Sequence, residues 1–189
     1  MTISVGDKIP EVTLIKATAE GPQPVKSSDY FAGKRVALFS VPGAFTPTCS
    51  AKHLPGFVEK AGDLKAKGVD EIVGTAVNDA FVMGAWNKAA GSDDITMLAD
   101  GNAEFVEAIG LTMDGSGFGL GKRGQRFSMV INDGVVEQLN VEELRLLKRR
   151  QAIEPVIAPP SQFQTDAAVA VEFLPAIQVG LRCADRGAA

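Results

Sequence analysis

The chain has 189 residues, of which 46% are hydrophobic and 22% charged, a length and composition typical of one globular domain with a short extension. Its net charge of −4, with no long run of Lys or Arg, gives no electrostatic basis for binding nucleic acid or an anionic membrane. The N-terminus lacks a secretory signal pattern and no segment approaches the ~20 apolar residues of a membrane span, so we expect a cytoplasmic protein.

Strands and helices are predicted to alternate along most of the chain. Short apolar runs predict strands over residues 36–41, 72–77, 96–99, 127–131 and 135–141. Helical spacing of apolar residues and capping residues predict helices over 48–67, 79–89 and 102–110. Asp133-Gly134 predicts a two-residue hairpin turn between the last two strands. This order indicates an α/β protein with a central, mainly parallel sheet, flanking helices and an antiparallel hairpin. A thioredoxin-like fold fits it, and a flavodoxin-like sheet is the alternative.

Three local features refine this outline. Pro55 predicts a kink in the first helix. The second helix is expected to bury Phe81, Val82 and Trp86. The segment 115–124 holds five glycines but precedes a strand, whereas a phosphate-binding loop lies between a strand and a helix, so we expect a flexible connection.

Cys49 lies at the start of the first predicted helix, directly after the first buried strand. Sites in open α/β sheets collect at the carboxyl ends of parallel strands, and the unpaired N–H groups of a first helical turn favour the nucleophilic thiolate. Thr46, three residues earlier, offers a hydroxyl to the sulfur and to an incoming oxygen. Pro42 and Pro47 stiffen the loop. The residues therefore predict a reactive thiol, with a small buried apolar residue as the alternative for Cys49.

A cation should complete such a site, and we choose Arg126. It directly precedes the strand 127–131, and if that strand is antiparallel to the central ones, Arg126 lies at the edge where their carboxyl ends meet. Its guanidinium is always charged and offers a rigid fork of donors. Lys122 and Arg123 are the rival cations.

His53, the only histidine, lies one helical turn after Cys49. One interpretation is a Cys–His nucleophile pair. The other, which we favour, is a supporting histidine packed near the site, since a base one turn along the same helix points poorly at the sulfur.

The segment 42–49, with the sequence PGAFTPTC, resembles the peroxiredoxin active-site signature. Three further blocks, HLPGF at 53–57, VNDAFV at 77–82 and RFSMV at 126–130, resemble type II peroxiredoxins, in the same order. The resemblance covers about residues 1–141. It implies a thioredoxin-like fold and a thiol-dependent peroxidase that reduces hydrogen peroxide and alkyl hydroperoxides.

The resemblance also implies roles for individual residues. Cys49 would be the peroxidatic cysteine that attacks the peroxide and becomes a sulfenic acid. Thr46 and Arg126 would align the peroxide, and Pro42 would shield the sulfenate. No metal, haem or flavin is implied. The reductant would be glutaredoxin, glutathione or thioredoxin, and the protein would form a homodimer through its active-site face.

The resemblance stops near residue 142, so we divide the chain into a domain of residues 1–141 and a divergent tail of residues 142–189. The tail is a genuine extension, a disordered appendage or the product of a shifted reading frame, and we favour the shifted frame. Some atypical relatives carry a resolving cysteine near the C-terminus. Cys183 has that position but not the surrounding motif, so we favour a one-cysteine mechanism with an external thiol.

Three other functions remain open at this point. The first is a thiol–disulfide oxidoreductase, against which the missing CxxC motif argues. The second is a peroxide sensor or redox-regulated holdase whose oxidised form binds a partner. The third is a structural thioredoxin-like module in which Cys49 is inert.

Overall fold

The computed structural model describes residues 1–47 and 49–142, so the predictions for residues 143–189, Cys183 among them, lie outside the described part of the chain. The strands are β1 (Thr13–Thr18), β2 (Gly21–Lys26), β3 (Arg35–Ser40), β4 (Glu71–Ala76), β5 (Ile95–Ala99), β6 (Thr112–Asp114), β7 (Lys122–Gly124), β8 (Phe127–Asn132) and β9 (Val135–Val141). The helices are α1 (Ser27–Phe31), the π-helix η1 (Cys49–His53), α2 (Leu54–Glu59), α3 (Ala61–Ala66), α4 (Ala80–Ala89), α5 (Glu104–Ala108) and the 3₁₀ turn η2 (Ser116–Phe118).

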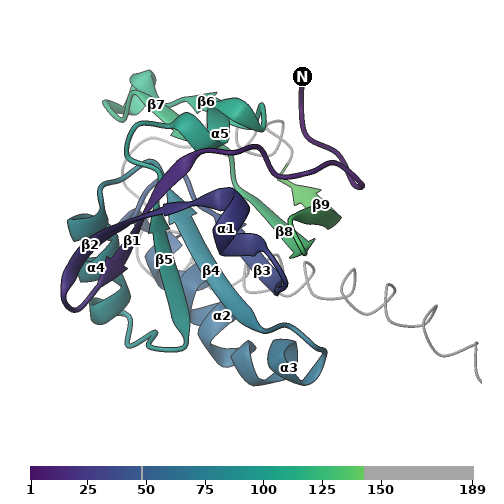
Figure 1. Cartoon of the computed structure of the whole chain (residues 1–189). Coiled ribbons are helices and arrows are strands. Elements are labelled where there is room, and N and C mark those ends of the chain that lie inside the picture. The colour runs from purple at the N-terminus through teal and green to yellow at the C-terminus, as the bar shows by residue number, and fades with distance from the viewer. Residues whose placement is uncertain (48, 143–189) are drawn as a thin grey trace, which may run out of the picture.

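A seven-stranded sheet in the order β2-β1-β5-β4-β3-β8-β9 runs through the molecule between helices (Figure 1). All five predicted strands are confirmed. The parallel part is limited to β3, β4 and β5, and antiparallel strands extend the sheet on both sides. The sequence pattern missed the hairpin of β1 and β2, because Pro22 and Pro24 argue against a strand. Both lie in β2 at the edge of the sheet, where a missing N–H is tolerated.

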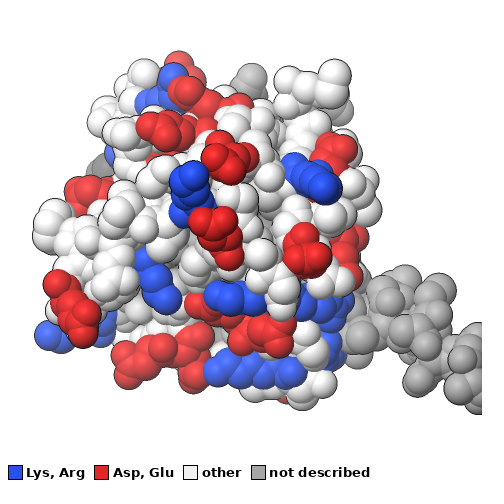
Figure 2. Space-filling view, viewed as in Figure 1, with Lys and Arg blue, Asp and Glu red and all other residues white. Residues whose placement is uncertain are grey.

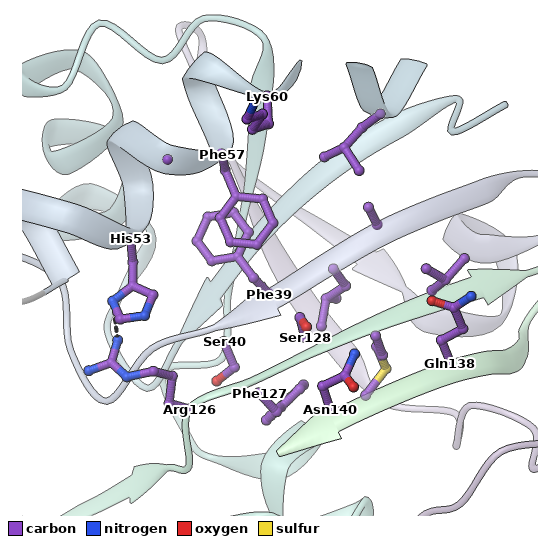
Figure 3. A pocket seen from close by; sticks show the side chains of 16 residues that line it. Phe39, Ser40, His53, Phe57, Lys60, Arg126, Phe127, Ser128, Gln138 and Asn140 are labelled. Carbon is purple, nitrogen blue, oxygen red and sulfur yellow. Dashed lines mark hydrogen bonds between the residues drawn. The ribbon is translucent and has the colours of Figure 1, made fainter. Parts of the chain in front are cut away.

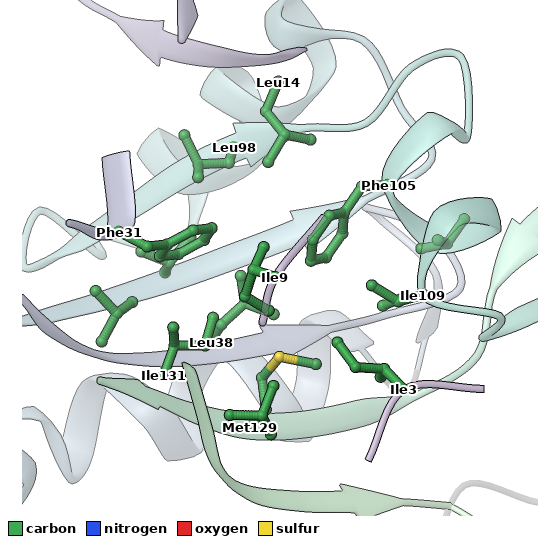
Figure 4. Close-up of a cluster of buried hydrophobic side chains, with 14 of the residues drawn as sticks. Ile3, Ile9, Leu14, Phe31, Leu38, Leu98, Phe105, Ile109, Met129 and Ile131 are labelled. Carbon is green, nitrogen blue, oxygen red and sulfur yellow. The ribbon is translucent and has the colours of Figure 1, made fainter. Parts of the chain in front are cut away.

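Each face of the sheet has its own apolar core, since successive side chains of a strand point to opposite faces. Val36 and Leu38 of β3 pack on the face that α1 and α5 cover, as Figure 4 shows for that cluster. Ala37 and Phe39 pack on the other face, with residues of α2, α3 and α4. This double burial explains why β3 reads as a continuous apolar run.

The segment predicted as one kinked helix over 48–67 is divided into η1, α2 and α3. Pro55 lies in the first turn of α2, directly after η1 ends at His53, a position that tolerates a residue without N–H. The predicted kink stays a prediction. The prediction that α4 buries Phe81 is wrong. Phe81 is 74% exposed, because the buried stripe of α4 consists of Ala80, Met83 and Trp86.

The glycine-rich segment 115–124 forms the loop and the second strand of a short hairpin. Gly115 N–H donates to the carbonyl of Gly121 at 2.7 Å, and β7 pairs with β6. The hairpin lies beside α5 in Figure 1, and the flexible connection expected for this segment stays a prediction.

The hairpin of β8 and β9 turns at Asp133-Gly134, as predicted. Both turn residues have positive φ angles, 48° and 75°, which the favoured two-residue hairpin turn requires. Beyond the turn, the pairing register shifts by one residue. Ile131 pairs with Val136, but the next residue of β8, Val130, pairs with Gln138. The extra residue is Glu137, which forms a β-bulge.

The face of the molecule seen in Figure 2 carries acidic and basic side chains interspersed, without a field of one sign. Within the described residues, no helix combines the length and the apolar character that crossing a membrane demands.

Glu71 anchors the end of the sheet opposite Cys49. Tyr30 Oη donates to its Oε1 at 2.6 Å, Thr96 Oγ1 donates to the same oxygen at 2.7 Å, and Lys34 Nζ lies 3.3 Å from Oε2. Burial acts to raise the pKa of Glu71, but the hydrogen bonds from Tyr30 and Thr96 and the charge of Lys34 outweigh it and hold the pKa below its usual value of 4.5.

We predict that Glu71→Gln lowers the free energy of unfolding by about 1.5–3 kcal/mol at neutral pH, the range for hydrogen bonds to a charged group. A carboxyl group with a depressed pKa stabilises the fold above its unfolded value of 4.5, and this contribution disappears as the pH falls through the lower folded-state pKa. The difference between wild type and variant, measured by urea unfolding, should therefore shrink in acid. Glu20→Gln in the exposed β1–β2 turn is the control, and a pH-independent difference would contradict the prediction.

Candidate active site

Cys49 is the first residue of η1 and follows the loop after β3. Its side chain is a free thiol, 1% exposed, and belongs to the apolar core on the α2 side of the sheet. A π-helical turn at this point is notable because such turns occur frequently at functional sites. Burial alone would suit an inert cysteine equally well, so the charged groups around the sulfur decide its character.

The loop between β3 and η1 is held in a strained form. Phe45 has a φ angle of 59°, in the left-handed region that bulky residues rarely occupy. Ala44 N–H donates to Asn78 Oδ1 at 3.0 Å, and Thr46 Oγ1 donates to the carbonyl of Gly43 at 2.8 Å. Pro42 is half-buried just after β3. The catalytic roles predicted for Thr46 and Pro42 remain predictions.

Arg126 reaches the thiol, as its predicted position requires. Its Nη1 lies 3.4 Å from Cys49 Sγ, and its side chain is 10% exposed. The reason is the sheet register, in which Phe127 of β8 pairs with Ser40 of β3, so that Arg126 stands at the carboxyl edge of the parallel strands. Because Phe127 points into the α5-side core, its neighbour Arg126 points to the opposite face, toward η1.

The two rival cations are engaged elsewhere. Lys122 pairs with Glu107. Arg123 donates through Nε to the carbonyl of Leu120 at 2.8 Å and through Nη1 to the carbonyl of Val77. Arg123 thus ties the glycine-rich hairpin to the end of β4.

His53 lies against the same arginine. Arg126 Nη1 is 2.7 Å from His53 Nδ1, the contact dashed in Figure 3. Arginine has no acceptor, so Nδ1 must accept this hydrogen bond, which assigns a neutral imidazole with its hydrogen on Nε2. In this state Nδ1 accepts its hydrogen bond from Arg126, which argues against a Cys–His pair that uses this nitrogen as the base.

Glu142 is a site residue that the sequence reasoning missed. Its Oε2 accepts a hydrogen bond from Arg126 Nε at 2.7 Å, and its side chain, like that of Arg126, is 10% exposed. Regular pairing from the Asp133-Gly134 turn would place Val141 opposite Arg126. Only the bulge at Glu137 brings Glu142 there, and the residues gave no sign of a bulge.

An apolar groove extends along the sheet from Arg126 and His53 (Figure 3). Phe39 of β3 and Phe57 of α2 stack in it with ring centroids 4.1 Å apart and an interplanar angle of 10°. Gln138 and Asn140 of β9 lie at its other side. Nowhere in residues 1–47 and 49–142 do three His, Cys, Asp or Glu side chains form a group that could hold a metal ion.

Trp86 connects helix α4 to the turn that carries the thiol. Its Nε1 donates to Ser50 Oγ at 3.0 Å, and the indole is 2% exposed. We therefore expect oxidation of Cys49 to change the emission of Trp86, because the oxidised sulfur disturbs the helical turn that holds Ser50.

The measurement is fluorescence during titration with hydrogen peroxide, and it is unambiguous because Trp86 is the only tryptophan. Ser50→Ala should reduce the change, whereas Ser116→Ala in the distant turn η2 should not. An unchanged emission in protein shown by intact mass to be oxidised would contradict the expectation.

Comparison with known proteins relates this geometry to a family. Residues 4–152 match the family model described as Redoxin. Over 148 residues the chain is 52% identical to Peroxiredoxin-2E-2, chloroplastic, of Oryza sativa subsp. japonica, a match that covers 75% of this chain and 66% of that protein. It is 48% identical to Peroxiredoxin-2B of Arabidopsis thaliana over 74% of this chain and 88% of that protein. The chain thus spans slightly less than two thirds of the rice protein.

Solved structures agree in fold. The crystal structure of reduced Prx3 in complex with H2O2 from Vibrio vulnificus superposes with a TM-score of 0.72 at 47% identity, covering 89% of this chain and 99% of that one. A 1-Cys peroxiredoxin of Plasmodium falciparum superposes with a TM-score of 0.74 at 25% identity, covering 92% of this chain and 99% of that one. The thioredoxin-like prediction is thereby confirmed, and the flavodoxin-like alternative is set aside.

Proposed function

Because the chain belongs to the peroxiredoxins of the redoxin family, we propose that it is a thiol-dependent peroxidase in which Cys49 reduces hydrogen peroxide and alkyl hydroperoxides. The observation that carries the proposal is the 3.4 Å contact between Arg126 Nη1 and Cys49 Sγ. A guanidinium against a buried sulfur favours the thiolate, which is the nucleophilic form. An inert core cysteine would gain nothing from a buried cation.

The chemistry needs side chains of the loop and of η1, together with Arg126, which directly precedes β8. The Cys49 thiolate attacks one peroxide oxygen, the O–O bond breaks, an S–O bond forms, and the departing oxygen takes a proton to leave as water or an alcohol. Arg126 offers donors to the oxygen on which charge develops. No metal or other cofactor takes part in this proposal.

Thr46 and Pro42 have complementary parts in this scheme. The hydroxyl hydrogen of Thr46 is engaged by the carbonyl of Gly43, so its oxygen is left as an acceptor for the peroxide O–H. Pro42 is half-buried beside the loop and provides no N–H, which suits a residue that shields the sulfenic acid from side reactions.

The burial of Cys49 limits how the sulfenic acid is reduced. A protein thiol cannot reach a sulfur that is 1% exposed, so η1 must open before glutaredoxin or thioredoxin reacts. Glutathione, a small thiol, needs a smaller opening. In either case one thiol displaces the sulfenic oxygen as water and forms a mixed disulfide, and a second thiol releases Cys49. We propose a one-cysteine mechanism of this kind, with the cytoplasm as the compartment.

We predict that Cys49→Ser abolishes rapid oxidation by stoichiometric hydrogen peroxide, followed by stopped-flow fluorescence and intact mass, because the variant has no thiolate to attack. Cys183→Ser should react as wild type does and leave a sulfenic acid or its glutathione adduct.

An internal disulfide that requires both cysteines would replace the one-cysteine mechanism. Oxidation of wild type no faster than that of free cysteine would overturn the peroxidase proposal. A stable oxidised form that captures a protein would support the sensor or holdase.

A homodimer through the active-site face is part of the proposal. Phe45, in the loop before η1, is 54% exposed, and Phe81, in the first turn of α4, is 74% exposed. The hydrogen bond from Ala44 N–H to Asn78 Oδ1 joins that loop to the residues directly before α4. Large aromatic side chains exposed on neighbouring segments are typical of a surface that is covered in an assembly.

We therefore expect sedimentation velocity to find a dimer for wild type and a monomer for Phe81→Glu, with unchanged circular dichroism. Val5→Glu is the matched control, because Val5 is also exposed (61%) but lies next to the start of β9, at the other end of the sheet. A monomeric wild type, or a Phe81→Glu variant that dimerises as well as wild type, would contradict the dimer.

A further inference from the structure

We infer that Glu142 is a positioning residue of the reaction: it orients the guanidinium of Arg126 toward Cys49. The inference rests on the proposed peroxidase function and extends it to a residue outside the segments that resemble the family signature. Two contacts join the pair, the side-chain bond from Arg126 Nε to Glu142 Oε2 at 2.7 Å and the backbone bond from Glu142 N–H to the carbonyl of Arg126 at 2.9 Å.

The geometry explains why a carboxylate is needed at this place. A guanidinium is planar and rigid, so fixing Nε fixes the direction of the terminal nitrogens. Glu142 holds Nε, and Nη1 is then directed at Cys49 Sγ, 3.4 Å away, and at His53 Nδ1, 2.7 Å away. Without the carboxylate, the long side chain of Arg126 regains rotamer freedom that Glu142 now removes.

The choice of Nε also leaves the terminal nitrogens for the reaction. A carboxylate that accepted from both Nη groups would compete with the sulfur and with the peroxide for the same donors. Glu142 accepts from Nε, on the side of Arg126 away from the thiol. The buried carboxylate also balances the charge of Arg126, since both side chains are only 10% exposed.

The two roles of the arginine can be separated in experiment. Alkylation of Cys49 by iodoacetamide needs a thiolate but no aligned peroxide, whereas oxidation by hydrogen peroxide needs both. Loss of orientation should therefore slow oxidation more than alkylation, because the positive charge of Arg126 stays near the sulfur while its donors lose the direction that aligns the peroxide.

We expect Glu142→Ala to slow oxidation by roughly 10- to 100-fold, the range for supporting residues whose loss misplaces a reacting group, and to slow alkylation much less. Glu142→Gln keeps an acceptor of the same shape and should stay within about threefold of wild type. Glu142→Asp keeps the charge but withdraws it by one methylene, so it should be slow in oxidation even though the fold is retained.

Glu107→Ala is the matched control: Glu107 also pairs with a cation, Lys122, but it lies on α5 and contacts neither Arg126 nor Cys49. Stopped-flow oxidation, alkylation rates and thermal unfolding are measured for all variants. The inference is overturned if wild type is fast and Glu142→Asp and Glu142→Ala are equally fast, or if Glu107→Ala shows the same loss. It is also overturned if oxidation and alkylation fall by the same factor. A wild type no faster than free cysteine would instead refute the peroxidase function itself.

Discussion

The antiparallel pairing of β8 with β3 is the constraint on which the active site depends. It places Phe127 opposite Ser40, and thereby brings Arg126 to the edge of the sheet where the loop to Cys49 begins. A slip of one residue would turn Arg126 to the other face, into the core that α1 and α5 cover. The contact between residues 49 and 126 is therefore set by strand register, although each belongs to a segment that can be recognised by itself.

Arg126 contacts three polar groups in the interior of the protein. The guanidinium touches a thiol, an imidazole nitrogen and a carboxylate, all in a region with little access to water. A buried cation is tolerable because the carboxylate of Glu142 compensates its charge. The helical turn of Cys49 and the hairpin of β8 and β9 are thus coupled through one side chain.

Much of this arrangement could be predicted from the sequence. The buried strands are continuous apolar runs, the Asp133-Gly134 turn is a strong local signal, and Arg126 follows from its position before a strand. Other features depend on tertiary packing. Phe81 has the same character as its buried neighbours, and only the orientation of α4 exposes it. Glu142 could not be found because its place opposite Arg126 depends on a bulge that leaves no mark in residue type.

The bulge in β9 has a consequence for how the family can change in length. The register of the β8–β9 ladder starts at the turn, and Glu137 is the one residue of β9 that has no partner in β8. Deletion of Glu137 would leave each remaining pair intact, so Glu142 would still face Arg126, whereas deletion at another point of the strand would bring new partners together. A relative whose sequence lacks a residue at position 137 would therefore keep the pairing of Glu142 with Arg126. A relative of equal length keeps this pairing only if its strand also contains a bulge.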